Sequence, residues 1–129
     1  MSVPKAVFEP LRIKGKTLLP IVQGGMGVGV SAHRLAGTVA SLGAMGTISS
    51  VDLRRHHLDL MAETARSRDR ALIDAVNLQA LDREVRSALR LARGEGAVAV
   101  NFMRAVSAYA QYVRRACESG AHAVVVGAG

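Results

Sequence analysis

The sequence is poor in aromatic residues, cysteine and proline. Its 129 residues include two tyrosines, two phenylalanines, three prolines, one cysteine and no tryptophan. A lone cysteine cannot form a disulfide within the chain, which favours a reducing compartment. No apolar run approaches the roughly 20 residues that span a bilayer, and residues 1–16 have no uninterrupted apolar core like that of a signal peptide. We therefore expect a cytoplasmic protein without a membrane partner.

The charge is one-sided, because 17 Lys and Arg residues against 10 Asp and Glu residues give a net charge of +7. A clustered basic surface attracts nucleic acid or acidic ligands. Here the arginines are spread over predicted helices with acidic residues between them, and aromatic residues that would stack on bases are scarce. We predict a solvated surface and no nucleic-acid partner, including on the helix face with Arg83, Arg86, Arg90 and Arg93.

Half of the residues are hydrophobic, mostly alanine, valine and leucine, which suits helices packed on a buried parallel sheet. The apolar pattern predicts strands at 19–23, 44–48, 97–101 and 123–126 and helices at 31–42, 74–93 and 106–119. An extended segment with a turn at 14–16 precedes them, and 51–67 forms one or two short helices. Ser31 and Asp74 are the expected N-caps of the first two long helices. This order implies parallel strands joined by right-handed crossovers in a single α/β unit, residues 1–129.

The clearest motif is a glycine-rich loop directly after the first predicted strand. Four glycines in six residues follow Gln23, and Ser31 closes the stretch; the glycines are Gly24, Gly25, Gly27 and Gly29. Because glycine has no Cβ, backbone N–H groups can approach a flat ring or a phosphate closely. Ligands of βα units lie at this carboxyl end of the strand.

Two folds share this order of elements, and the residues alone leave both open. A doubly wound dinucleotide-binding domain would use Gly27, Gly29 and Ala32 as its fingerprint, with Asp52 for the ribose. A (β/α)₈ barrel would instead bring four polar or glycine-rich strand ends together at one mouth. Those ends are residues 23–26, 49–50, 101–103 and 127–129.

Four ordered motifs carry a resemblance to a known family. Residues 20–31 (PIVQGGMGVGVS), 43–48 (GAMGTI), 100–103 (VNFM) and 124–129 (VVVGAG) resemble successive strands of nitronate monooxygenases, formerly 2-nitropropane dioxygenases. The related FMN-dependent enoyl-acyl carrier protein reductases share this pattern. The resemblance implies an FMN-dependent TIM barrel, of which this chain would be the N-terminal fragment, a parallel (β/α) half-barrel.

The resemblance also implies a cofactor site. The backbone of Gly24, Gly25 and Met26 would lie against the flavin ring of FMN, the Asn101 side chain would hydrogen-bond FMN, and Gln23 is a further candidate. The catalytic histidine and the FMN-phosphate loops of the family come later in the barrel, so we expect no catalytic residue in this chain. In the complete enzyme the substrate would be a small molecule, a nitronate or similar, oxidised with O₂.

Three alternative functions accompany this prediction. The first is an enoyl-acyl carrier protein reductase, because the first half of the barrel does not separate the two substrates. The second is an NAD-binding doubly wound domain. The third is an inactive remnant, since a truncated sheet would expose strand edges and self-associate.

The histidines and the cysteine are predicted to have no functional role. His56 and His57 have no third ligand at metal-binding spacing and are expected at a solvated helix end. His33 is expected to be exposed, and His122 precedes a strand at the end opposite to catalysis. Cys117 is expected to be a buried small hydrophobic residue. No metal site is predicted.

Overall fold

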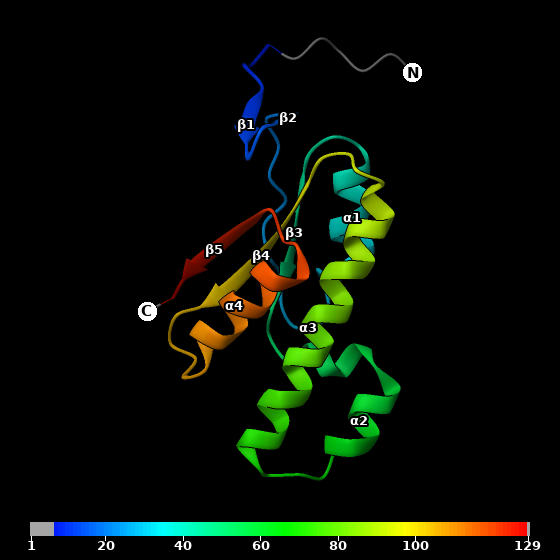
Figure 1. Cartoon of the computed structure of the whole chain (residues 1–129), viewed down its shortest axis with the longest axis vertical. Coiled ribbons are helices and arrows are strands. Elements are labelled where there is room, and N and C mark those ends of the chain that lie inside the picture. The colour runs from blue at the N-terminus through cyan, green and yellow to red at the C-terminus, as the bar shows by residue number, and fades with distance from the viewer. Residues whose placement is uncertain (1–6, 129) are drawn as a thin grey trace.

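The structure is a computed structural model that describes residues 7–128. It is a mixed α/β fold with a three-stranded parallel sheet in the order β3 (Met45–Ser49), β4 (Ala97–Met103) and β5 (Ala123–Gly127). Two short antiparallel strands, β1 (Leu11–Ile13) and β2 (Lys16–Leu18), form a hairpin ahead of it. Figure 1 shows this hairpin at one end of the elongated molecule, away from α2.

Residues 19–23, predicted as the first strand, run parallel to β3 but form only one β-bridge, between Val22 and Met45. The Leu19 and Gln23 N–H groups donate to the carbonyls of Gly43 and Met45, both at 2.9 Å. Between them the Ile21 N–H donates to the Leu19 carbonyl at 2.7 Å. This local turn removes the Ile21 N–H from the ladder. The segment is therefore an irregular edge beside β3, and the order across the sheet follows the chain.

The long helices are α1 (His33–Ser41), α3 (Arg70–Ala92) and α4 (Tyr109–Ser119). Between β3 and α3 lie a short 3₁₀ helix, η1 (Leu53–His56), and α2 (Leu58–Thr64), as the pattern at 51–67 predicted. Figure 1 shows α3 beside α1 at one end and beside α4 further along. Within residues 7–128 no helix combines the length and apolar character that crossing a bilayer requires.

The two predicted N-caps are wrong. The N-cap of α1 is Ala32, and the Ser31 hydroxyl instead accepts the Met26 N–H at 2.8 Å. Helix α3 begins a turn earlier than predicted, because the Asp69 carboxylate accepts the N–H groups of Ala71 and Leu72. Asp74 lies inside that helix. In α3 a capping residue five positions upstream competed successfully with the one chosen from the apolar pattern.

The helices α1, α3 and α4 cover one face of the sheet. The strand residues on this face are Ile48, Val98, Val100 and Phe102. Helix α1 approaches so closely that a Cβ on Gly46 would lie 1.9 Å from the Ala36 carbonyl oxygen. Leu42, which directly follows α1, is 72% exposed. Cys117 is also exposed, contrary to prediction, since α4 turns Tyr112, Ala116 and Ser119 inward.

The opposite face of the sheet carries no helix within the described residues. Its amino-terminal half is covered by the hairpin, where Leu18, Leu11 and Ile13 pack against Met45 and three alanines of the strands (Ala97, Ala99 and Ala123). A doubly wound domain reverses its strand order and carries helices on both faces. Residues 7–128 show neither feature.

Candidate functional site

The glycine-rich loop folds over the carboxyl end of the sheet, on the face without helices. A Cβ on Gly25 would lie 2.7 Å from the Asn101 Cβ and 3.6 Å from the Thr47 Cγ2. A Cβ on Gly27 would lie 2.9 Å from the Ser49 Oγ. The loop backbone therefore rests directly on the ends of β3 and β4, and any side chain at position 25 would displace it.

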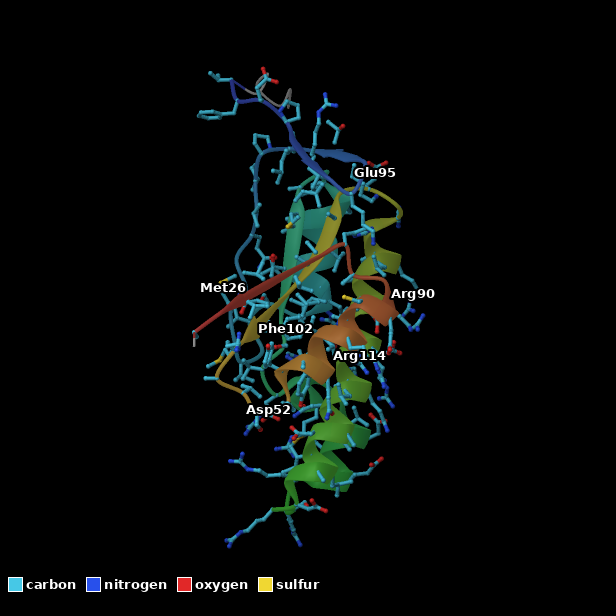
Figure 2. The ribbon with its side chains drawn as sticks, turned by 60° about the vertical axis from the view of Figure 1, so that its left-hand side comes forward. Met26, Asp52, Arg90, Glu95, Phe102 and Arg114 are labelled. Atoms are coloured by element: carbon cyan, nitrogen blue, oxygen red, sulfur yellow. The ribbon has the colours of Figure 1, made fainter. Side chains whose placement is uncertain are left out.

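The strand ends predicted to share one edge do so. Ser49 is paired with Asn101, and Met103 is paired with Gly127, in the parallel registers of β3–β4 and β4–β5. The Ser50 N–H donates to the Asn101 carbonyl at 3.1 Å, which joins the first two ends. Figure 2 shows Met26, at the tip of the glycine-rich loop, across the sheet from Arg90 and Arg114.

The loop is held by side-chain and backbone hydrogen bonds. The Ser31 hydroxyl accepts the Met26 N–H, and the Ser31 N–H donates to the Met26 carbonyl at 2.9 Å. The Ser31 carbonyl in turn accepts the Ser49 N–H at 3.0 Å. These bonds close residues 26–31 into a compact turn fixed to the end of β3.

Gln23 uses its carboxamide inside the fold. Its Oε1 accepts the Thr47 N–H at 2.9 Å, and its Nε2 donates to the Thr47 carbonyl at 3.1 Å. The same Nε2 donates to the Gly24 carbonyl. The side chain thus continues the pairing with β3 at Thr47, beyond the last backbone bond from Gln23 to Met45, and its polar atoms are already bonded.

The other predicted site residues leave polar groups available. Among residues 7–128 no acceptor is recorded for the N–H groups of Gly24, Gly25 and Gly27, and no partner for the Asn101 carboxamide. An asparagine at the end of a strand can also cap the loop that follows it. The Asn101 side chain forms no such hydrogen bond with the described residues. No heavy atom lies within 4 Å of a Cβ built on Gly24, and Met26 is 41% exposed.

This donor set fits one edge of a flavin ring, which presents carbonyl oxygens and ring nitrogens to backbone N–H groups. The buried Thr47 Oγ1 beneath Gly25 has no hydrogen-bond partner among the described residues, so the face also holds an unused polar atom. No group of three His, Cys, Asp or Glu side chains in residues 7–128 is placed to hold a metal ion. The loop offers backbone N–H groups beside the Asn101 carboxamide, and the exposed His56 imidazole lies 3.5 Å from a Cβ built on Gly29 of the same loop.

A second polar cluster is buried under α1, and the sequence prediction missed its centre, Glu84. The Glu84 side chain is 1% exposed; its Oε2 lies 2.8 Å from the His33 Nδ1, and its Oε1 lies 3.0 Å from the His57 Nε2. The His33 N–H also donates to Oε2 at 2.7 Å, so Glu84 caps α1 from another helix. His33 and His57 were predicted to be exposed. Both are instead partly buried against Glu84.

A signal for Glu84 existed in the sequence. Residue 84 falls on the apolar stripe of α3, three positions after Leu81 and four before Ala88, both fully buried. A charged residue at such a position requires buried partners. The partners come from residues 33 and 57, far away along the chain, and periodicity could not identify them.

His122 lies at the end of the sheet opposite to the glycine-rich loop. It lies just before β5, at the amino end of the strands, and its Nδ1 accepts the Val98 N–H at 3.0 Å. Burial and then the nearby charges of Lys16 and Lys14 lower the pKa of His122. A neutral imidazole can accept this bond, so the residue helps to join β4 and β5.

Compared with models of known protein families, the chain matches none, and no curated protein sequence matches it significantly. The site is therefore interpreted from its own geometry.

Proposed function

We propose that this chain provides the flavin-ring half of an FMN-dependent oxidoreductase of the nitronate monooxygenase type. Its sheet would be part of a parallel (β/α) barrel, to which further strands contribute the phosphate site and the catalytic histidine. The observation that carries the proposal is the contact of the Gly25 backbone with Asn101 at the carboxyl end of β4. Barrel enzymes bind their ligands at this end of the strands.

The topology supports the barrel part of the proposal. Parallel strands in chain order, with all three long helices on one face, are the arrangement from which (β/α) barrels are built. The three valines of β5 are all partly exposed. Val124 and Val126, on one face, are 39% and 45% exposed, and Val125, on the other face, is 42% exposed. A strand that is apolar on both faces is suited to burial between a helix and a barrel interior.

The roles proposed for the residues follow from their contacts. Gly24 and Gly25 would donate backbone N–H groups to the polar edge of the ring, and the Asn101 carboxamide would donate or accept beside them. Met26 would cover the ring with its side chain. Gln23 would act as a positioning residue, because its amide fixes the loop to Thr47. FMN supplies electron transfer from the nitronate to oxygen, and no proton transfer is assigned to a residue of this chain.

The alternatives differ in what supports them. An enoyl-acyl carrier protein reductase would use the same residues for the same ring, so substrate turnover by a complete barrel separates it from the proposal. An NAD-binding doubly wound domain would require a reversal of strand order and helices on both faces, neither of which residues 7–128 contain. Self-association through the β5 edge is compatible with the proposal, because a missing neighbour leaves that edge unpaired.

Flavin titration of the full chain tests the proposal. Riboflavin and FMN share the ring and differ in the phosphate, so we expect saturable quenching of both flavins with Kd values within about threefold of each other. Binding of FMN more than about tenfold tighter than that of riboflavin, or 1.4 kcal/mol, would indicate a phosphate site in this chain. That result would contradict the proposal that further strands contribute the phosphate site. Absence of quenching with both flavins would refute the ring site.

Variants locate the binding on the loop. Gly24→Leu fills the open space in front of the loop, and Asn101→Leu removes the carboxamide at similar volume; each should weaken riboflavin binding about tenfold. Gln111→Leu, on the exposed side of α4, introduces the same side chain away from the loop and should leave binding unchanged. Thermal unfolding of each variant checks that the fold is retained.

A further inference from the structure

A cavity of about 140 Å³ lies on the helix-covered face of the sheet, between the ends of β3 and β4 and the helices α3 and α4. Its walls come from the segment after β3, the first half of α3, the end of β4 and the start of α4. They are Ser50, Val51, Asp52, Asp74, Asn77, Phe102, Met103, Val106, Tyr109 and Tyr112. Asp52 and Phe102, two of these residues, lie near each other in Figure 2.

The cavity is large enough for a small organic molecule. A closed apolar cavity of about 150 Å³ binds benzene in another protein. Here the buried rings of Phe102 and Tyr112 form part of the wall, and Val106 on the exposed β4–α4 loop lies at its rim, 40% exposed. An apolar interior with an open side fits a ligand that has a hydrocarbon part.

The acidic residues of the wall differ in whether their charge is balanced. Asp52 forms ion pairs with Arg54 and Arg55. Asp74 accepts the neutral Tyr112 hydroxyl at 3.0 Å, and within residues 7–128 no cationic side chain forms an ion pair with it. One carboxylate on the wall is therefore unneutralised by the described chain.

The acidic side chains also act on Tyr112: burial raises the pKa of Tyr112, and the charges of Asp74 and Asp52 raise it further. The unpaired Asp74 carboxylate favours a cationic ligand and opposes an anion such as a nitronate. This cavity is thus separate from the flavin-ring site, which lies on the other face of the sheet.

We propose that the cavity binds a small organic ammonium ion, with its hydrocarbon part against Phe102 and its charged end at Asp74. The carboxylate would accept a charge-assisted hydrogen bond from the ammonium group. Tyr112 also lines the cavity, and an aromatic ring can attract a cation. Arg104, 5.0 Å from the centroid of the Tyr109 ring, already uses that other aromatic side chain in this way.

The chain offers a direct optical readout. It contains no tryptophan and only two tyrosines, and both tyrosines line the cavity. Tyrosine fluorescence and near-ultraviolet circular dichroism of the full chain therefore report on this cavity. The probe is n-butylammonium, which does not absorb in this range, and the matched neutral probe is 1-butanol. We expect a saturable change with n-butylammonium and binding of 1-butanol at least about tenfold weaker.

Three variants test the assignment. Asp74→Asn keeps an acceptor for Tyr112 and should weaken n-butylammonium binding about tenfold without affecting 1-butanol. Asp69→Asn removes one charge from the same helix outside the cavity, retains an N-cap residue, and should leave binding unchanged. Val106→Phe should block both probes by filling the open side.

The outcomes decide the proposal. Equal binding of the two probes, or n-butylammonium binding that Asp74→Asn does not weaken, would overturn the ammonium site. A lack of any tyrosine signal with both probes would also overturn it. Should Asp74→Asn fail to fold, the comparison of the two probes and the Val106→Phe variant still decide. None of these results depends on flavin binding.

Discussion

Replacing Glu84 by glutamine should destabilise the chain strongly, although the two side chains have almost the same shape. Glu84 is 1% exposed and lies within 3.0 Å of ring nitrogens of both His33 and His57. Removing one partner of a buried ionic cluster costs about 3–5 kcal/mol, because the remaining charge loses its compensation. His33 and His57 are 32% and 18% exposed, so water can reach their rings and relieve part of this penalty.

We therefore expect the lower end of that range, about 3 kcal/mol. Glutamine still has one carbonyl oxygen that can accept the His33 N–H, so the cap of α1 is retained and the loss is electrostatic. Glu84→Ala would lose this cap as well, at a further cost of about 1 kcal/mol, in addition to the cavity that it creates.

Urea unfolding at neutral pH measures the effect. With an m-value of about 2 kcal/mol per M, the midpoint of Glu84→Gln should fall by about 1.5 M. The control is Glu118→Gln, whose side chain is 59% exposed and 3.6 Å from the Arg115 Nε. Its stability should change by no more than about 0.5 kcal/mol, as is usual for a surface pair. A Glu84→Gln midpoint within about 0.3 M of the parent would show that the charge of Glu84 contributes little, and would refute the reasoning.

Other predictions concern packing and pH. Gly46→Ala should cost about 3 kcal/mol or prevent folding, because the new Cβ would meet the Ala36 carbonyl oxygen at 1.9 Å. The control is Gly24→Ala, which should leave the thermal midpoint nearly unchanged because no heavy atom lies within 4 Å of the new Cβ. An equal loss of stability in Gly46→Ala and Gly24→Ala would contradict this account. Burial raises the pKa of Asp52, but hydrogen bonds from Arg55, Arg54 and Asn77 outweigh it and hold the pKa below 3.8. A lowered folded-state pKa stabilises the fold above the unfolded value, and this contribution is lost as the pH falls through the folded value. The parent should therefore lose more stability than Asp52→Asn between about pH 5 and pH 2, measured by urea unfolding across that range; parallel losses would disprove the link.

Most of the elements could be predicted from the sequence, although residues 19–23 form one β-bridge where a strand was expected, and the hairpin was expected only as an extended segment with a turn. Apolar alternation and glycine boundaries predicted the positions of β3, β4, β5, α3 and α4, apart from a shift of α3 to an earlier N-cap. These signals are local, since a strand or a helix shows its period within a few turns of chain. The grouping of the strand ends at one edge also followed, because parallel strands joined by crossovers have their carboxyl ends on the same side.

Details that depend on a distant partner could not be predicted. The role of Gln23 in continuing the pairing with β3 depends on the backbone of Thr47, which lies 24 positions away. The burial of small residues in α1 depends on how closely that helix approaches Gly46. Each of these features is decided by a contact between elements, not by the period of one.

The sequence by itself determined the element order, the parallel sheet and the glycine-rich loop, since each depends on residues close together in the chain. Only the tertiary structure decided that all three long helices share one face and that His33 and His57 meet at Glu84. It also decided that Asp74 and both tyrosines surround one cavity. The physical reason is that local propensity acts within a few residues, whereas burial, charge compensation and cavity shape depend on which distant surfaces come into contact.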